Sequence, residues 1–425
     1  MGQVTSPPLL DETGISAVTA LNKIAQAISS LNGDIYGFIE HMDVLSPSQR
    51  IEWTDKNASF SNPLTVNKSA GTFSYGDWSG FPLLVNNKPY MVKADGTPDY
   101  RLNENDYTKK LDGTASDVAN TSYAGGAFSW LQRIYKYESR NGSDRIVKFS
   151  FTKHPGFLPV GFEDDEGHEL SGVWLPMFYG TVVDSKAKCI AAGNGLSGGN
   201  LTTDAQHTAV AAFHAKARFF GGPIVETIID LLMMFAKTSD LQDAYGNGNM
   251  SGYVSASPYG MKDNAVVGGG QFYGTTDGSS LNKIFHSIVL GSYQQWMRDP
   301  YEVVVNGKIK VSKNYVYDPT GALYFDTGIT VPDLSAGWRY PKLYHTVEGY
   351  GSLPDVSSAQ GSTTTGPCDG TYSTTQSTLV AVSLRFGRCD RGALDGPRAR
   401  SWGSAASNSD WNFGFALLLK GPVAA

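Results

Sequence analysis

The strongest constraint on the fold comes from the C-terminal stretch between Leu384 and Leu419, where two kinds of residue alternate. Glycine, alanine and apolar residues form one set, which suits a packed scaffold. Arginine, tryptophan, aspartate and small polar residues form the other set. This second set suits an exposed contact surface, because Trp and Arg dominate binding sites while Ser, Asn and Gly supply adaptable hydrogen bonds.

The interleaved set supplies the candidate ligand-binding residues, namely Arg388, Asp390, Arg391, Asp395, Arg400, Trp402, Ser404, Asn408, Asp410 and Trp411. Taken singly, each arginine is as readily a solvated side chain, and each tryptophan a core residue. The prediction therefore depends on their concentration in one loop-rich stretch. Strand register stays open by one residue, and a slip would exchange the inward and outward sets.

Several short motifs in this stretch follow the order of a known fold. They are Arg385-Phe386-Gly387, Gly392-Ala393, Arg398-Ala399 and Asn412-Phe413-Gly414-Phe415. Together they resemble the closing half of the C-type-lectin-like fold, which formylglycine-generating-enzyme-like domains share with variable proteins of diversity-generating retroelements. The resemblance implies that Arg398 belongs to the frame. The chain departs from the pattern at Phe386, where Gly is usual, and at Ala416, where Arg is usual.

A longer match lies upstream, between Tyr90 and Asp117. It is similar to the lead-in of many phage-encoded variable proteins, nearly residue for residue from 102 to 116. Cys368-Asp369-x-x-Tyr372 is similar to the segment before their final strands. The resemblance implies an α+β fold, with a C-type-lectin-like domain at the C-terminus, preceded by a small β-rich region and an N-terminal helix. Two segments, 204–218 and 223–237, are predicted helices inside that domain.

Three regions are expected from this reading. Residues 1–45 form an extended arm and an oligomerising helix, 46–122 a β-rich linker domain, and 123–425 the C-type-lectin-like domain with its variable-type tip at 384–419. The helix is predicted from a heptad seam with isoleucine at a and d positions, which favours three or more strands. The seam residues are Leu21, Ile24, Ile28, Leu31, Ile35, Phe38 and Met42. A single helix packed on its own domain is the alternative, and Gly33 and Gly37 weaken either helix by about 1 kcal/mol each.

Composition narrows the function classes. The chain has 48 glycines, 12% aromatic residues and only 17% charged residues, which suits a β-rich protein of a particle or an extracellular surface. A net charge of −6 without a basic run argues against a nucleic-acid partner. No apolar run is long enough to insert into a membrane. Three cysteines give no disulfide framework, and free buried thiols are favoured over a bridge between Cys368 and Cys389.

Three further patterns do not support a metal or cofactor site, so neither a metal nor a cofactor is predicted. The acidic cluster at 162–169 is either a calcium loop or a solvated hairpin tip, and its spacing favours the tip. Gly193-x-Gly195-x-x-Gly198 lacks the acidic residue that a dinucleotide site places about twenty positions later. His207 and His214 are seven residues apart, which does not match a zinc pair.

The resemblance implies a phage virion protein, the receptor-binding tip of a tail fibre or head fibre. Its expected partners are further copies of the chain, which the seam predicts to form trimers, other virion proteins at the N-terminus, and a bacterial surface protein or glycan. A capsid decoration or baseplate component without a host ligand is the alternative. A formylglycine-generating oxidase is disfavoured, because Cys389 has no second thiol nearby and no other catalytic set replaces it.

Overall fold

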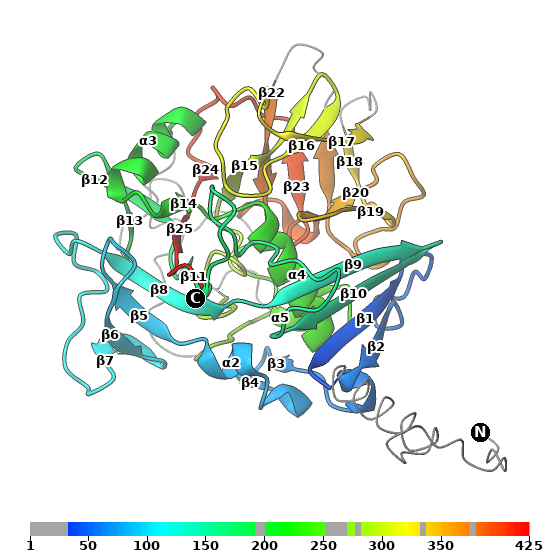
Figure 1. Ribbon diagram of the computed structural model, residues 1–425, viewed down its shortest axis with the longest axis horizontal. Coiled ribbons are helices and arrows are strands. Elements are labelled where there is room, and N and C mark those ends of the chain that lie inside the picture. The colour runs from blue at the N-terminus through cyan, green and yellow to red at the C-terminus, as the bar shows by residue number, and fades with distance from the viewer. Residues whose placement is uncertain are drawn as a thin grey trace, which may run out of the picture.

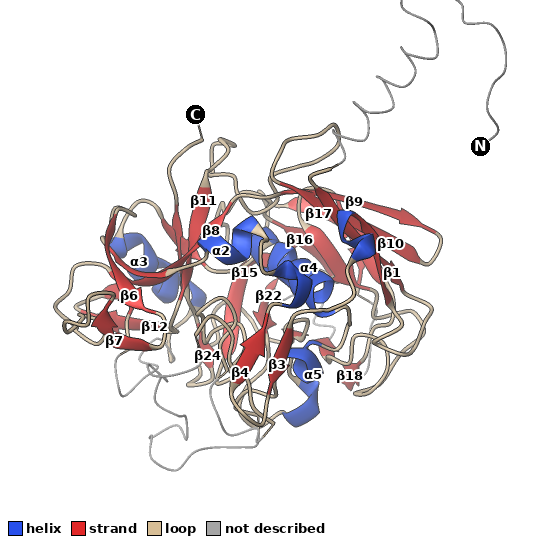
Figure 2. Ribbon diagram, turned by 90° about the horizontal axis from the view of Figure 1, so that it is seen from below, coloured by secondary structure: helices blue, strands red, loops and turns tan. Residues whose placement is uncertain are grey.

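The computed structural model describes residues 33–191, 200–250, 270–276, 282–331, 337–373 and 380–424. Strands supply most of its regular structure, and they lie on several sides of a central helix (Figures 1 and 2). One large sheet has the strand order β14 (Ala217–Phe219), β25 (Leu417–Lys420), β11 (Gly172–Pro176), β8 (Gly126–Gln132), β5 (Pro89–Val92), β6 (Pro98–Asn103) and β7 (Asp106–Lys110). This sheet joins strands from the first third of the chain to its C-terminal end.

A second large sheet holds most of the C-terminal third. Its order is β17 (Phe325–Thr330), β16 (Lys308–Val311), β15 (Trp296–Val305), β22 (Val380–Arg385), β23 (Arg400–Trp402), β21 (Thr371–Ser373) and β18 (Gly337–Arg339), with β24 (Phe413–Gly414) pairing beside β15. The turn between β15 and β16 is at Asn306-Gly307, where both residues have the positive φ that a tight hairpin turn of this kind requires.

A four-stranded sheet and three hairpins complete the strands. The sheet has the order β2 (Ile51–Asp55), β1 (Ile35–His41), β10 (Asp144–Ser150) and β9 (Tyr135–Asn141). The hairpins are β3–β4 (Thr65–Asn67, Thr72–Ser74), β12–β13 (Gly180–Val183, Lys186–Cys189) and β19–β20 (Tyr344–Val347, Gly351–Pro354). The helices are α2 (Pro82–Asn86), α3 (Thr203–Phe213), α4 (Pro223–Ala236) and α5 (Leu241–Tyr245). None of the described helices is long and apolar enough to cross a bilayer.

Helix α4 forms the centre of the molecule (Figure 1). It begins with a proline at its first turn and is buried from end to end. Two of its buried residues are acidic, and they lie four positions apart. Glu226 pairs with Arg385 and Arg400 of the second large sheet, whereas Asp230 pairs with Arg145 of the four-stranded sheet. Two carboxylates on one helix therefore fix two sheets in place.

A third buried carboxylate, Glu40, joins distant parts of the chain. Glu40 of β1 accepts hydrogen bonds from Arg50 at 2.9 Å, Arg145 at 2.9 Å and Arg398 at 3.0 and 3.1 Å. Burial alone would raise the pKa of Glu40, but the three guanidinium groups hold it well below its usual range. Because Arg398 is buried in this cluster, the expectation that it belongs to the frame agrees with the structure.

The predicted fold class is wrong. An α+β protein with a C-type-lectin-like C-terminal domain and an N-terminal helix does not describe this chain, because its described residues form mainly β-sheets. The predicted helix at 223–237 is present as α4, and the one at 204–218 is present as α3 but ends at Phe213, before strand β14; most of the other regular elements described in the predicted domain are strands. β-branched and aromatic residues, which favour a pleated surface, run through the whole chain and account for the difference.

The predicted heptad seam is also corrected where the structure describes it. Leu21, Ile24, Ile28 and Leu31 lie outside the described residues. Ile35 and Phe38 lie in strand β1, between β2 and β10, and together with Met42 they are buried within this chain. Gly37 sits mid-strand with Asp55 and Thr54 packed closely above it. The apolar spacing of 3 and 4 here reflects a two-sided buried strand, which hydrophobic periodicity alone does not separate from a helix.

The expected region boundaries at 45 and 122 do not coincide with sheet boundaries. Strand β1 pairs with β2 beyond residue 45, and β5 pairs with β8 beyond residue 122. One hydrophobic core also runs from Tyr36 to Leu419. The described residues therefore share sheets and a core across both positions.

Candidate ligand pocket

The register of the second large sheet decides which C-terminal residues face outward. Leu384 of β22 pairs with Ser401 of β23, Ser401 pairs with Tyr372 of β21, and Tyr372 pairs with Trp338 of β18. Directly paired residues project to the same face of a sheet. On β15, Leu384 pairs with Arg298, so Trp296, two positions earlier, shares that face. Five neighbouring strands thus contribute one row of side chains.

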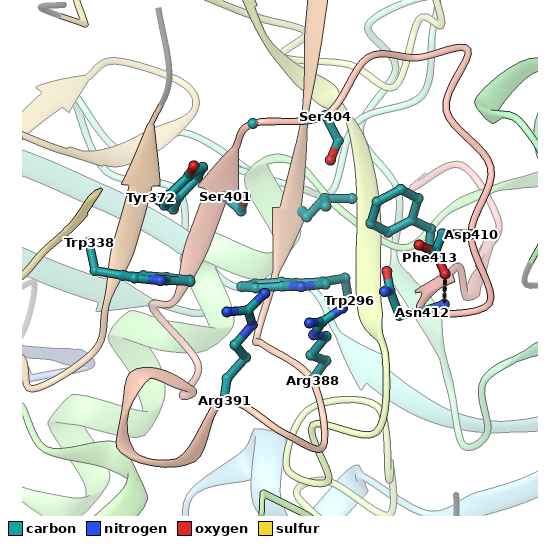
Figure 3. Close-up of a pocket in the computed structure, with 12 residues that line it drawn as sticks. Trp296, Trp338, Tyr372, Arg388, Arg391, Ser401, Ser404, Asp410, Asn412 and Phe413 are labelled. Atoms are coloured by element: carbon teal, nitrogen blue, oxygen red, sulfur yellow. Dashed lines mark hydrogen bonds between the residues drawn. The ribbon is translucent and has the colours of Figure 1, made fainter. Parts of the chain in front are cut away.

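This row forms the base of a cavity of about 310 Å³, here called the aromatic pocket. Its lining residues are Trp296, Trp338, Tyr372, Leu384, Arg388, Arg391, Ser401, Gly403, Ser404, Asp410, Asn412 and Phe413. The indole planes of Trp296 and Trp338 are 9° apart with centroids separated by 6.1 Å. Figure 3 shows them edge-on along one line, so the two rings make a flat plate. The ring of Tyr372 lies 5.4 Å from that of Trp338.

The loop between β22 and β23 brings two arginines to the plate. Gly387 has a φ of +105°, and a Cβ there would lie 1.7 Å from the Oδ1 atom of Asp395. The same Oδ1 accepts a hydrogen bond from the Arg388 backbone N–H at 3.1 Å. Glycine therefore lets the buried Asp395 fold the loop onto itself. The Arg391 guanidinium lies 5.8 Å from the Trp338 ring centroid, and both arginines lie on one side of the plate in Figure 3.

The opposite wall comes from the loop after β23. Asp410, Asn412 and Phe413 lie at its end (Figure 3). Arg298, which is buried, anchors this loop by donating a 2.8 Å hydrogen bond to the Asn408 carbonyl and by packing 5.3 Å from the Phe413 ring. A strand-borne arginine thus fixes the position of the wall.

The opposite face of the same strands carries a buried ion-pair network. Arg385 and Arg400 both contact Glu226 of α4 and Glu302 of β15, with Glu302 at 3.2 Å from each. Trp402 donates its indole N–H to Glu302 at 2.7 Å. Burial tends to raise the pKa of Glu302, but the charges of Arg400 and Arg385 lower it below its usual range. This network holds the sheet on α4 beneath the pocket.

The structure separates the predicted binding residues into groups. Arg388, Arg391, Ser404 and Asp410 line the aromatic pocket. Asp390 is exposed beside it and pairs with the Arg388 Nε atom at 2.6 Å, Asn408 is exposed on the anchored loop, and Trp411 is partly buried against the core. The prediction is wrong for three others, because Asp395, Arg400 and Trp402 are sealed from solvent. Strand parity explains the error for Arg400 and Trp402: Ser401 faces the pocket, so its neighbours on both sides face α4. Asp395 is buried within the loop, where its Oδ1 atom accepts the Arg388 backbone N–H.

Sequence reasoning missed the aromatic base of the pocket. Trp338, Tyr372 and Trp296 all lie upstream of the predicted tip. Residues His286 to Asp299, which include Trp296, are buried throughout. Glu226 and Glu302, which pair with the buried Arg385 and Arg400, also lie upstream of the predicted tip. A period-2 pattern with aromatic residues on short strands was the available signal, but strand pairing is not visible from one sequence.

The polar side chains of the other candidate sites make contacts with residues of the same chain. In the acidic cluster, Asp164 accepts the backbone N–H groups of Glu166 and His168 at 2.9 and 2.8 Å, which makes a turn. His207 stacks on Tyr317 with centroids 4.0 Å apart. The described residues contain no group of three or more His, Cys, Asp and Glu placed to hold a metal ion. The Gly193 to Gly198 motif lies outside the described residues.

The three cysteines are free and buried, as expected. Burial raises the pKa of the Cys189 and Cys389 thiols to about 12, which disfavours the reactive thiolate.

Two other cavities are less suited to recognition than the aromatic pocket. One, of about 340 Å³ around Trp130 and Trp174, has no charged residue in its lining. The other, of about 310 Å³, has at its wall Lys136, which is paired with Glu138 and Asp230.

No protein-family model matches this chain, and none of the curated proteins matches it either.

Proposed function

We propose that this chain is a receptor-binding protein of a phage particle, which attaches the particle to a bacterial surface through the aromatic pocket. One observation carries the proposal: five strands present aromatic and polar side chains in one row, and two arginines from a loop lie over it. Aromatic and arginine side chains on a rigid base are the composition of binding sites. The resemblance to phage variable proteins between Tyr90 and Asp117 supports the same role.

Diversification by a retroelement forms part of this proposal. The pocket arginines lie on the loop after β22, and Ser404 and Asp410 lie on the loop after β23. Both loops fall within 384–419, and both are held by buried residues, Asp395 and Arg298. A near-repeat of the 3′ end of the gene beside a reverse transcriptase gene would support diversification. Without such a repeat, a binding protein with a fixed pocket remains.

A structural role in the particle is the second candidate. Leu323 and Phe325 are exposed by 77% and 50%, and Phe325 begins β17, the edge strand of the second large sheet. Exposed apolar side chains at a sheet edge favour contact with another chain. A decoration or baseplate protein would use this edge and would have no need of the pocket. Catalysis is not proposed, because buried thiols with raised pKa values are poor nucleophiles.

The deciding experiment measures adsorption. Purified chain carrying Arg388→Ala and Arg391→Ala is compared with the unchanged chain for binding to cells of the host strain. A double variant at two exposed lysines away from the pocket, Lys186→Ala and Lys308→Ala, removes the same charge and serves as the control. We expect the arginine variant to lose at least about tenfold in affinity, since charged hydrogen bonds contribute about 1.5–3 kcal/mol each. Equal adsorption by both variants, with unchanged oligomer mass, would reject the pocket as the attachment site.

A further inference from the structure

The flat plate of the aromatic pocket fits one kind of surface. An aromatic ring has a negative face, which attracts weakly positive C–H groups lying against it. Trp296 and Trp338 both line the pocket, their planes differ by only 9° and they lie along one line in Figure 3, so Trp338 and the 4% exposed Trp296 together give such a face. A saturated ring with several C–H bonds on one side would pack on this plate. Pyranose sugars have that shape, with hydroxyl groups around the rim.

The arginines add a preference for negative charge. Arg388 uses its Nε atom to bind Asp390, and its terminal amino groups contact no acceptor among the described residues. Arg391 makes no ion pair with a described carboxylate, and its Nε atom is buried without a hydrogen-bond partner. Planar guanidinium groups bind carboxylates with two parallel hydrogen bonds. Two of them on one side of the plate form a cradle for an anionic substituent (Figure 3).

The far wall supplies acceptors for hydroxyl groups. Asn412 is 3% exposed, lines the pocket, and has an Oδ1 atom without a hydrogen-bond partner. Buried polar atoms are nearly always paired in native proteins, so an unpaired acceptor facing a cavity indicates a missing donor. Asp410 and Ser404 line the same cavity. A ligand with hydroxyl donors at one end and a carboxylate at the other would satisfy both walls.

We infer that the aromatic pocket binds an acidic sugar, a pyranose with a carboxylate, as a terminal or penultimate residue of a surface glycan. This inference rests on the proposed function, because it names the ligand class of the same pocket. A volume of about 310 Å³ is at the small end of ligand pockets, so it suits one or two sugar rings instead of a long chain segment. The mixture of aromatic plate, guanidinium cradle and hydroxyl acceptors favours a sugar over an acidic peptide, which would not use the plate.

The test uses four soluble probes and the full chain. D-glucuronic acid and N-acetylneuraminic acid carry carboxylates, D-glucose is the neutral counterpart, and a tri-aspartate peptide is an anion without a sugar ring. Binding is measured by calorimetry and by the change in tryptophan fluorescence. We expect at least one acidic sugar to bind about tenfold or more tightly than glucose. Arg391→Ala should remove the preference for the acid, whereas Trp338→Ala should weaken both kinds of sugar.

Binding of glucose as tightly as the acidic sugars, or of tri-aspartate as tightly as both, would overturn the inference. Binding that is unaffected by both Arg391→Ala and Trp338→Ala would place the sugar elsewhere and would also overturn it. Arg391→Lys, which keeps the charge but loses the planar fork, should retain part of the preference and shows that the fold is intact.

The same experiment separates this inference from the proposed function. The acidic sugar is added during adsorption of the purified chain to host cells. If the arginine double variant fails to adsorb but no acidic sugar binds the unchanged chain, the attachment role stands and the ligand class is wrong. If an acidic sugar binds the pocket but adsorption is equal in the arginine variant, the ligand class stands and the attachment role is wrong.

Discussion

Replacing Arg400 by alanine tests the assignment of strand faces most directly. Arg400 is fully buried and contacts Glu226 and Glu302. Arg385 is the second cation that pairs with these two carboxylates. The cluster of these four residues balances two carboxylates with two guanidinium groups. Arg400→Ala leaves one carboxylate uncompensated in the interior and also removes a 3.2 Å hydrogen bond to the Ser352 carbonyl. We expect a loss of about 3–5 kcal/mol in the free energy of unfolding.

The destabilisation caused by Arg400→Ala should depend on pH, and the sign of this dependence follows from the charge left in the interior. In the variant, one of the two carboxylates must take up a proton to remain buried beside a single cation, so its pKa in the folded state rises. The unfolded chain releases that proton above about pH 4. The folded variant therefore binds more protons than the unfolded chain at neutral pH, and its stability increases as the pH falls. The deficit should shrink between pH 8 and pH 5.

Urea unfolding, followed by tryptophan fluorescence, measures both effects. Arg391→Ala is the matched control, because Arg391 is partly exposed at the pocket and has no ion pair with a described residue, so its loss should cost less than about 1 kcal/mol. A second variant, Arg400→Met combined with Glu302→Gln, restores the charge balance and should be less destabilised than Arg400→Ala at pH 8. If Arg400→Ala and Arg391→Ala cost the same at every pH, Arg400 does not point into the interior and the assigned register is wrong.

Further predictions concern other buried groups. Glu40→Gln should cost about 3–5 kcal/mol in urea unfolding, because three arginines depend on Glu40. Burial tends to raise the pKa of Asp230, but Arg145 lowers it to about 2. Asp230 should therefore add about 2 kcal/mol to the free energy of unfolding above pH 4, and this contribution should be lost as the pH falls to 2. The Asp230→Asn variant should lack this part of the acid-induced loss of stability. Gly387→Ala should cost about 1–3 kcal/mol and weaken pocket binding, since the new Cβ meets Asp395; equal melting temperatures would contradict this. The three buried thiols should react with a disulfide reagent only on unfolding, and prompt labelling of native protein would contradict their burial.

Local patterns in the sequence were sufficient for some elements. The apolar run that becomes α4 begins at a proline and is helical in the structure. The Asn306-Gly307 pair, which is typical of tight hairpins, forms the turn between β15 and β16. The concentration of arginine and small polar residues at the C-terminus also indicated two loops that line the pocket. These features depend on neighbouring residues only, so one sequence contains the information that decides them.

Pairings between distant residues were not available from the sequence. Glu40 and Arg398 are 358 positions apart, and Glu226 and Arg400 are 174 apart, yet each pair decides which side of a strand is inside. Arg400 and Trp402 flank Ser401, and neither is an aliphatic residue, so hydropathy does not show that Ser401 faces the pocket and its neighbours face the interior. In β1, an apolar spacing of 3 and 4 resembled a helix because both faces of that strand are buried. Sheet partners on either side overrode the local pattern.

The row of paired residues from Trp296 to Trp338 has an evolutionary consequence. Residues that touch the outside and residues that hold the sheet on its helix alternate along the same few strands. Substitutions at every second position would therefore change the surface of the pocket, while the residues between them keep the sheet packed on α4.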